Sequence, residues 1–196
     1  MNVIDISDWQ EGLNFDDLRN NGVDGVVIKI EEGQSEDADF ETFLQDVENE
    51  ELEWGVYLFS HATSTDIAIQ EAQNLIANLN GRVPPLGTWY DIEADECFNS
   101  GVNPTDLCSS FICTVNDAGL KCGIYASDGK FGEGENEINP NTLGDYVPYW
   151  VAEYGVSQCD FPSQYPNKHM AAWQDSENGN IDGTNVDTDQ WYDDPL

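Results

Sequence analysis

Basic residues are scarce in this chain of 196 residues. Six lysines and arginines stand against 39 aspartates and glutamates, which gives a formal net charge of −33 at pH 7. A surface this acidic repels polyanions, so binding of nucleic acid or of an anionic membrane through a basic patch is excluded. The same charge favours solubility, and salt would screen its self-repulsion. We therefore expect no nucleic-acid partner and no membrane insertion.

Histidine is equally scarce. The two histidines, together with the lack of a Cys-x-x-Cys or Cys/His spacing, give no zinc site. The late aspartates also lack the pattern of a calcium loop, and we interpret most of them as solvated charge: Asp182, Asp187, Asp189, Asp193 and Asp194. We therefore expect no metal and no cofactor.

Long apolar runs are missing too. No run approaches the roughly 18 apolar residues that span a bilayer, and an apolar segment follows Met1 and Asn2 directly, so we expect no signal peptide in this sequence. Five cysteines are an odd number, which leaves at least one thiol unpaired if the others form up to two disulfides. A content of 39% hydrophobic and 11% aromatic residues is typical of one globular domain. We expect a monomer whose single domain covers residues 1–196.

Short apolar and β-branched runs punctuate the chain. They predict strands at 3–7, 25–31, 54–61, 88–93, 122–127, 149–154, 170–174 and 185–191. Amphipathic segments between the first five runs predict helices at 15–22, 39–51, 65–81 and 104–119. In the third helix, Thr65 or Asp66 is the expected N-cap and Gly81 the stop. The helical pattern fades after residue 127.

This alternation predicts an α/β fold with a parallel sheet and right-handed crossovers. Eight strands favour closure into a single-domain, abbreviated TIM-like barrel, because the regular version has about 250 residues. In such barrels the chemistry lies at the carboxyl ends of the strands.

The stretch TWYDIEADE at 88–96 places two carboxylates, Asp91 and Glu93, at the end of an apolar strand. Alternation along a strand would put both on one face, and burial of such a pair raises the pKa of at least one. A strand end where acids fan into solvent is the alternative, and it is equally compatible with this stretch alone.

Other acids and aromatic residues follow neighbouring strands. Asp5, Glu31, Glu32 and Asp187 could meet the pair in one cleft, with aromatic walls from other strands: Tyr57, Phe59, Tyr125, Trp150, Tyr154 and Trp173. Carboxylates perform acid/base chemistry, and flat rings cover the apolar faces of sugars, so the set is typical of a glycan-cleaving site. About half of these rings would fill the barrel interior instead.

Taken in order, VIDISDWQ, GVVIKIEEG, GVYLFSH, WYDIE, GIYAS, YWVAEY, AAWQ and the final VD resemble the lysozymes of glycoside hydrolase family 25, the Chalaropsis type, along almost the whole chain. The resemblance implies a (β/α)5(β)3 barrel. It also implies hydrolysis of the β-1,4 bond between N-acetylmuramic acid and N-acetylglucosamine in bacterial peptidoglycan, outside the producing cell.

The resemblance also assigns residues. The family's acidic pair falls on Asp91 and Glu93, its early aspartate on Asp5 and its late one on Asp187. Glu93 is the expected general acid/base, and Asp91 the ionised partner that orients an attacking N-acetyl oxygen, with retention of configuration. A covalent or inverting route through Asp5 or Asp187 stays open. The expected substrate-binding residues are Glu32, Tyr57, Phe59, Tyr125, Trp150, Tyr154, Trp173 and Gln174.

Two features depart from the family pattern. The segment usually written YHFAR reads YLFSH here, with Leu58 in place of the histidine, so contacts near this strand are expected to differ. The charge of −33 would also slow encounter with an anionic wall, unless high salt or a separate wall-binding module offsets it. A carbohydrate-binding protein on a catalytically idle barrel is the alternative function, and the retained acidic pair argues against it.

Overall fold

The core of the fold is a closed eight-stranded barrel. A computed structural model describes residues 1–193. The barrel strands are β1 (Asn2–Ile6), β2 (Gly25–Glu32), β4 (Glu53–Phe59), β5 (Thr88–Asp91), β6 (Cys122–Ser127), β7 (Pro148–Ala152), β8 (His169–Ile181) and β9 (Thr184–Trp191). A two-residue strand, β3 (Ser35–Glu36), pairs antiparallel with the end of β2. The predicted abbreviated barrel is confirmed.

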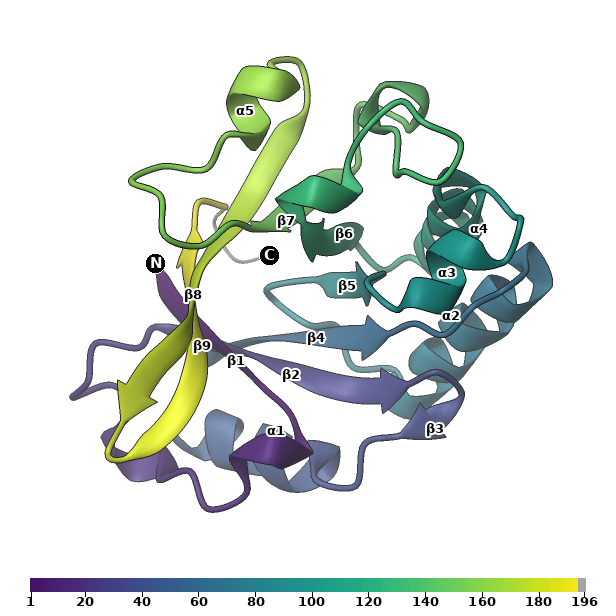
Figure 1. Cartoon of the computed structure of the whole chain (residues 1–196). Helices are drawn as coiled ribbons and strands as arrows, with labels where there is room; N and C mark the ends of the chain where they lie inside the picture. The colour runs from purple at the N-terminus through teal and green to yellow at the C-terminus, as the bar shows by residue number, and fades with distance from the viewer. Residues whose placement is uncertain (194–196) are drawn as a thin grey trace.

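Most neighbouring strands are parallel. Pairings from β1 through β2 and β4 to β8 run parallel, whereas β9 is antiparallel to both β8 and β1 and closes the ring. The last reversal needs only two residues. Asp182 and Gly183 both have positive φ, which is the geometry of the tightest hairpins. Figure 1 shows this β8–β9 hairpin projecting from one side of the barrel.

Five helices lie between residues 1 and 193. They are α1 (Phe40–Asn49), α2 (Thr65–Leu79), α3 (Asp95–Asn99), α4 (Pro104–Asp117) and α5 (Phe161–Gln164). Helices α2 and α4 pack side by side on the side opposite the hairpin (Figure 1). None of the helices between residues 1 and 193 has the length and apolar character needed to cross a bilayer.

The helix predicted at 15–22 is wrong. Only Phe15–Asp17 forms a short 3-10 turn, η2, and the following residues make turns that end at Gly22, which has positive φ. Consecutive asparagines before this glycine favour turns over helix, because their side chains compete for backbone groups. In α2 the N-cap is Ser64, one residue before the prediction, and its hydroxyl accepts a hydrogen bond from the Ile67 amide. The helix ends at Leu79 and its C-cap is Asn80, with a φ of 50° in the left-handed region, one residue before the predicted stop at Gly81.

Two apolar layers stabilise the barrel. The outer layer lies between the sheet and the helices, and the inner layer fills the barrel with aromatic rings packed edge-to-face or tilted against one another. Trp89, Trp150 and Trp191 meet there with ring centroids 5.3–5.9 Å apart. Because these rings fill one end of the barrel, polar side chains are confined to its other, carboxyl end. All five cysteines carry free thiols.

Candidate active site at the carboxyl end of the barrel

Strand β5 ends at Asp91, the first acid of the predicted pair. Trp89 belongs to the inner layer and Tyr90 to the outer one, so Asp91 points into the barrel mouth, as alternation predicts. The strand ends at Asp91, however, and Glu93 lies beyond it, which corrects the prediction that both acids belong to one strand. Glu93 comes from the following loop.

Glu93 is held by the end of the neighbouring strand β6. Its Oε1 accepts a hydrogen bond from the Ser127 amide at 2.6 Å and another from the Ser127 hydroxyl. The Lys130 ammonium donates to the Glu93 carbonyl at 3.0 Å. Ser127 and Lys130 fix the side chain and backbone of this acid, and sequence reasoning missed both because nothing local marks them.

Asp91 is buried and incompletely satisfied. It is 6% exposed, and its Oδ1 has no hydrogen-bond partner among the described residues. Burial raises the pKa of Asp91 well above its usual range, and the nearby Glu93 and Asp5 carboxylates raise it further. The pKa that burial raises is thus that of Asp91, the acid that was expected to be the ionised partner.

A second group of acids lies across the mouth on β1 and β9. Asp5 and Asp187 are opposite each other in the β1–β9 register. Gln174 of β8 donates from Nε2 to Asp5 at 2.7 Å and, more weakly, to Asp187 at 3.5 Å. Burial, reinforced by repulsion from Asp187, raises the pKa of Asp5 to about 7, and burial with repulsion from Glu177 raises that of Asp187 to about 6.

Asp189 also belongs to this group, contrary to its interpretation as solvated charge. It is 3% exposed and accepts a hydrogen bond from the Trp150 indole at 2.7 Å. Burial and repulsion from Asp5 raise its pKa well above the usual range, and its Oδ2 is buried with no hydrogen-bond partner among the described residues. Asp189 follows Asp187 by two residues on the same strand, so alternation places both on one face, and this was the signal in the sequence. Asp194 lies outside the described residues.

The predicted aromatic walls divide into two sets. Tyr57 and Phe59 are partly exposed, and Tyr154 is 41% exposed at the rim. Tyr125 and Tyr154 donate their hydroxyls to Gln174 Oε1. These residues lie around the acids.

The two tryptophans are placed differently. Trp150 is 1% exposed beneath the acids, and Trp173 is in the outer layer, where its indole donates to the Glu153 carbonyl at 2.8 Å. Both are supporting residues in this structure, because neither presents a ring surface to the mouth.

Glu31 and Glu32 separate at the end of β2. The Glu32 side chain reaches the mouth, 3.4 Å from the Lys29 ammonium, whereas the Glu31 side chain is buried beneath α2 and accepts a hydrogen bond from Asn78. Placing Glu31 in the cleft was wrong. The register of β2 shifts between Lys29 and Glu31, and such a bulge redirects the following side chain.

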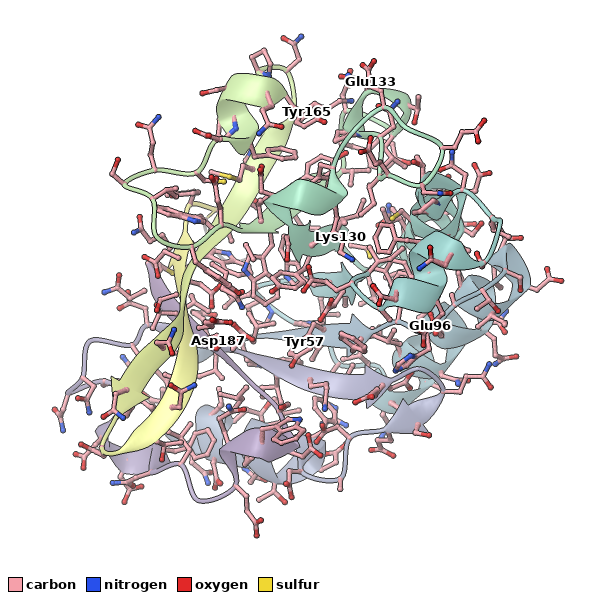
Figure 2. The ribbon with its side chains drawn as sticks, in the orientation of Figure 1. Tyr57, Glu96, Lys130, Glu133, Tyr165 and Asp187 are labelled. Carbon is pink, nitrogen blue, oxygen red and sulfur yellow. The ribbon has the colours of Figure 1, made fainter. Side chains whose placement is uncertain are left out.

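The mouth contains open space beside these acids. A cavity of about 290 Å³ is lined by Ser7, Trp9, Lys29, Glu32, Tyr57 and Phe59. Figure 2 shows Tyr57 between Asp187 and Glu96 in this view, with Lys130 above them. Within residues 1–193 no group of three or more histidine, cysteine or acidic side chains has the geometry to hold a metal ion. The arrangement offers a carboxyl with open surroundings, Glu93, next to a buried carboxyl with an unused acceptor, Asp91.

Comparison with known proteins places this arrangement in a family. Residues 4–184 match the model of glycosyl hydrolases family 25. The chain is similar to the autolytic lysozyme of Clostridium acetobutylicum, with 25% identity over 193 residues that cover 96% of this chain and 54% of that protein. It is also similar to lysozyme M1 of Streptomyces globisporus, with 26% identity over 197 residues covering 95% and 65%. The chain thus spans between about half and two thirds of these curated relatives.

A solved structure supports the same fold. The bacterial lysozyme from Streptomyces coelicolor aligns with a TM-score of 0.79 at 23% sequence identity, covering 99% of this chain and 93% of that chain. At this identity the likeness concerns the barrel itself.

Proposed function

The chain belongs to glycosyl hydrolases family 25, and we propose that it is a lysozyme that hydrolyses the β-1,4 bond between N-acetylmuramic acid and N-acetylglucosamine in bacterial peptidoglycan. The observation that carries the proposal is the Asp91–Glu93 pair at the barrel mouth, one acid buried with a free acceptor atom and the other on the loop beyond it. The names of the two curated relatives, both lysozymes, support the same activity.

The proposed reaction needs one protonated carboxyl and one ionised carboxylate in this pair. In the free protein, burial disfavours a charge on Asp91 and the adjacent Glu93 adds repulsion, and both raise the pKa of Asp91. An acetamido N–H of the substrate, donated to the unpartnered side of Asp91, would compensate its charge. The proton would then reside on Glu93, whose Oε1 keeps the hydrogen bonds from Ser127.

Bond cleavage follows from these positions. Glu93 donates its proton to the leaving glycosidic oxygen, while the acetamido oxygen of the same sugar attacks C1 and the C1–O bond breaks. Water then attacks C1, gives its proton to Glu93 and restores the acetamide. Two displacements retain the configuration at C1. A route through Asp5 or Asp187 would instead use the acids on β1 and β9, which Gln174 holds together.

The remaining residues have supporting roles in this proposal. Glu32, Tyr57, Phe59 and Tyr154 contact the glycan, and Tyr125, Trp150, Trp173 and Gln174 shape the site from beneath or beside it. Residues 1–196 act as one catalytic domain, monomeric and without a cofactor, on walls outside the producing cell.

The test measures wall hydrolysis. Wild type, Glu93→Gln and the surface control Glu48→Gln on α1 are incubated with purified cell walls, while turbidity and new reducing ends are followed. Borohydride reduction of the products identifies the sugar at the new end. We expect muramitol from wild type and from Glu48→Gln, and a loss of about 10²–10⁴-fold for Glu93→Gln.

Two outcomes would contradict the proposal. Equal clearing by wild type and Glu93→Gln would remove Glu93 from the mechanism. Clearing by none of the three, with glycan binding retained, would favour the alternative, a carbohydrate-binding protein on an idle barrel.

A further inference from the structure

His61 connects two acids that belong to different elements at the barrel mouth. Its Nδ1 lies 2.6 Å from Glu96 Oε1 on α3, and its Nε2 lies 3.3 Å from Glu32 Oε1 at the end of β2. Ionised carboxylates only accept hydrogen bonds, and a neutral imidazole has a single N–H to donate. The imidazolium is therefore the form of His61 that can bind both acids at once.

The position of His61 is fixed by contacts other than these two acids. Its amide donates to Glu71 Oε1 at 3.1 Å, and its ring packs edge-on against Phe59, with the ring centroids 5.2 Å apart. The ring also covers Gly33, whose φ is 59° and where an added Cβ would lie 3.4 Å from the imidazole. The imidazole is thus a fixed point at the ends of β2 and β4.

Helix α3 continues directly from the loop that carries Glu93. A helix of only five residues depends on side-chain contacts for its position. On the β6 side, the Lys130 ammonium lies 4.2 Å from the centroid of the Phe98 ring of α3 and also donates to the Glu93 carbonyl. On the β4 side, the contact is the one between His61 and Glu96. Figure 2 shows Lys130 above Glu96 in this view.

The two acids differ in what they keep when His61 loses its proton. Glu32 also lies 3.4 Å from the Lys29 ammonium, so it retains a cationic partner. Glu96 has no second cationic partner in the part of the chain that the structure describes. The effect of deprotonation therefore falls on α3 and the loop before it.

The charges around His61 favour its protonated form. Partial burial acts to lower the pKa of His61, but hydrogen bonds to Glu96 and Glu32 and the charges of these acids outweigh it and raise this pKa above the usual 6.5. Glu71 faces the ring from α2. A cavity of about 390 Å³ beside the ring is lined by further charged groups, mostly carboxylates: Asp8, Lys29, Glu32, Glu36 and Asp37.

We propose that His61 is a positioning residue for Glu93: its imidazolium holds α3 through Glu96, and loss of its proton loosens that side of the catalytic loop. The proposal rests on the proposed hydrolytic role of Glu93 and adds a pH-dependent contact outside the acids of the mouth. Exposed ion pairs are weak, and the buried Cys97 and Phe98 keep α3 packed. We therefore expect a change of about two- to fivefold in rate, without unfolding.

The first test compares the pH profiles of three proteins on solubilised peptidoglycan. His61→Arg is charged throughout the range from about pH 5 to pH 9, whereas His61→Gln is never charged. We expect kcat of wild type to follow His61→Arg at acid pH and to fall to that of His61→Gln at alkaline pH, with little change in KM. Because the acids of the mouth are the same in all three proteins, the ratio of wild type to His61→Gln isolates the titration of His61.

NMR measures that titration independently, because the chain has two histidines. His169, at the start of β8, is the matched control: its Nε2 also lies 2.6 Å from a carboxylate, that of Asp193, but at the amino end of the barrel. His169→Gln should leave the pH profile unchanged. The midpoint of the rate ratio should coincide with the pKa of His61, and Glu96→Gln should lower that pKa and flatten the ratio.

The Ser127 amide, which donates to Glu93 Oε1, gives a signal that does not require hydrolysis. Its chemical shift should follow the titration of His61 in wild type, and this component should vanish in His61→Gln. If walls are cleared but neither the rate ratio nor this shift follows His61, the positioning role fails and the lysozyme proposal stands. If the shift follows His61 while wild type leaves walls intact, the lysozyme proposal fails and the positioning role stands.

Discussion

Two groups of buried acids lie on opposite faces of the same sheet. The inner group occupies the barrel mouth and consists of the buried Asp5, Asp91 and Asp189 and the partly buried Asp187. The outer pair, Glu31 and Glu71, is fully buried between the sheet and α2. Burial raises pKa values in both groups, to about 8 for Glu31. A raised pKa therefore does not by itself identify a catalytic acid.

The difference lies in what surrounds the carboxyls. Glu71 accepts hydrogen bonds from the Ser60 and Tyr90 hydroxyls and from the His61 amide, all supplied by the protein. The inner group lies next to a cavity, because Phe59, the register partner of Asp91, lines it, and the neighbouring Glu93 is positioned by Ser127. The outer pair is a structural polar network, whereas the inner group has room for a ligand to complete it.

Replacing Asp91 with asparagine is the strongest test of this contrast. We expect Asp91→Asn to lower the rate of wall hydrolysis by about 10²–10³-fold, because the neutral amide cannot stabilise the positive charge that develops on the acetamido group. Thermal unfolding should occur at an equal or higher temperature, since the substitution removes repulsion from Glu93 and Asp5. A variant that keeps a tenth of the wild-type rate would contradict the assignment of Asp91.

The outer pair should behave in the opposite way. We expect Glu31→Gln to leave hydrolysis unchanged and to raise the free energy of unfolding by about 1–3 kcal/mol at pH 8, because the Glu31 Oε2 is buried without a partner and repelled by Glu71. A pKa of about 8, raised from 4.5, means that the folded protein binds the extra proton. The contribution of protonated Glu31 to the stability of the wild-type fold is therefore fully present below pH 4.5 and is lost as the pH rises through 8.

Urea unfolding at pH 4 and pH 8 measures this effect. Wild type and Glu31→Gln should have similar free energies of unfolding at pH 4, and the difference between them should grow towards pH 8. Glu71→Gln is the control from the same pair: its amide cannot accept all the hydrogen bonds that Glu71 accepts, so it should destabilise the protein. Stabilisation by both variants would show that the hydrogen bonds of Glu71 contribute nothing to the stability of the fold.

The sequence predicts one of the two groups and misses the other for a local reason. Strand and helix alternation is a strong periodic signal, so the barrel and the inward position of Asp91 follow from it. The outward turn of Glu31 depends on a one-residue register shift after Lys29, which periodicity does not show. Asp189 is similar, because its burial depends on how β9 pairs with β1. Long-range contacts such as Ser127 to Glu93 have no local signal at all.

The smallest expected effect concerns Asp187, the inner acid at the edge of the group. Burial and Glu177 raise its pKa from 3.8 to about 6, so its contribution to stability is fully present below pH 3.8 and is lost as the pH rises through 6. Asp187→Asn removes this titration and should flatten the decline in unfolding free energy between pH 4 and 6 by about 1 kcal/mol. This effect is smaller than for Glu31 because Asp187 is only partly buried and solvent screens its charge. Urea titrations at half-unit pH steps measure it, with Asp16→Asn on η2 as an exposed control. If the slope for Asp187→Asn matches wild type, Asp187 is solvated like a surface acid, and the inner group is smaller than the comparison assumes.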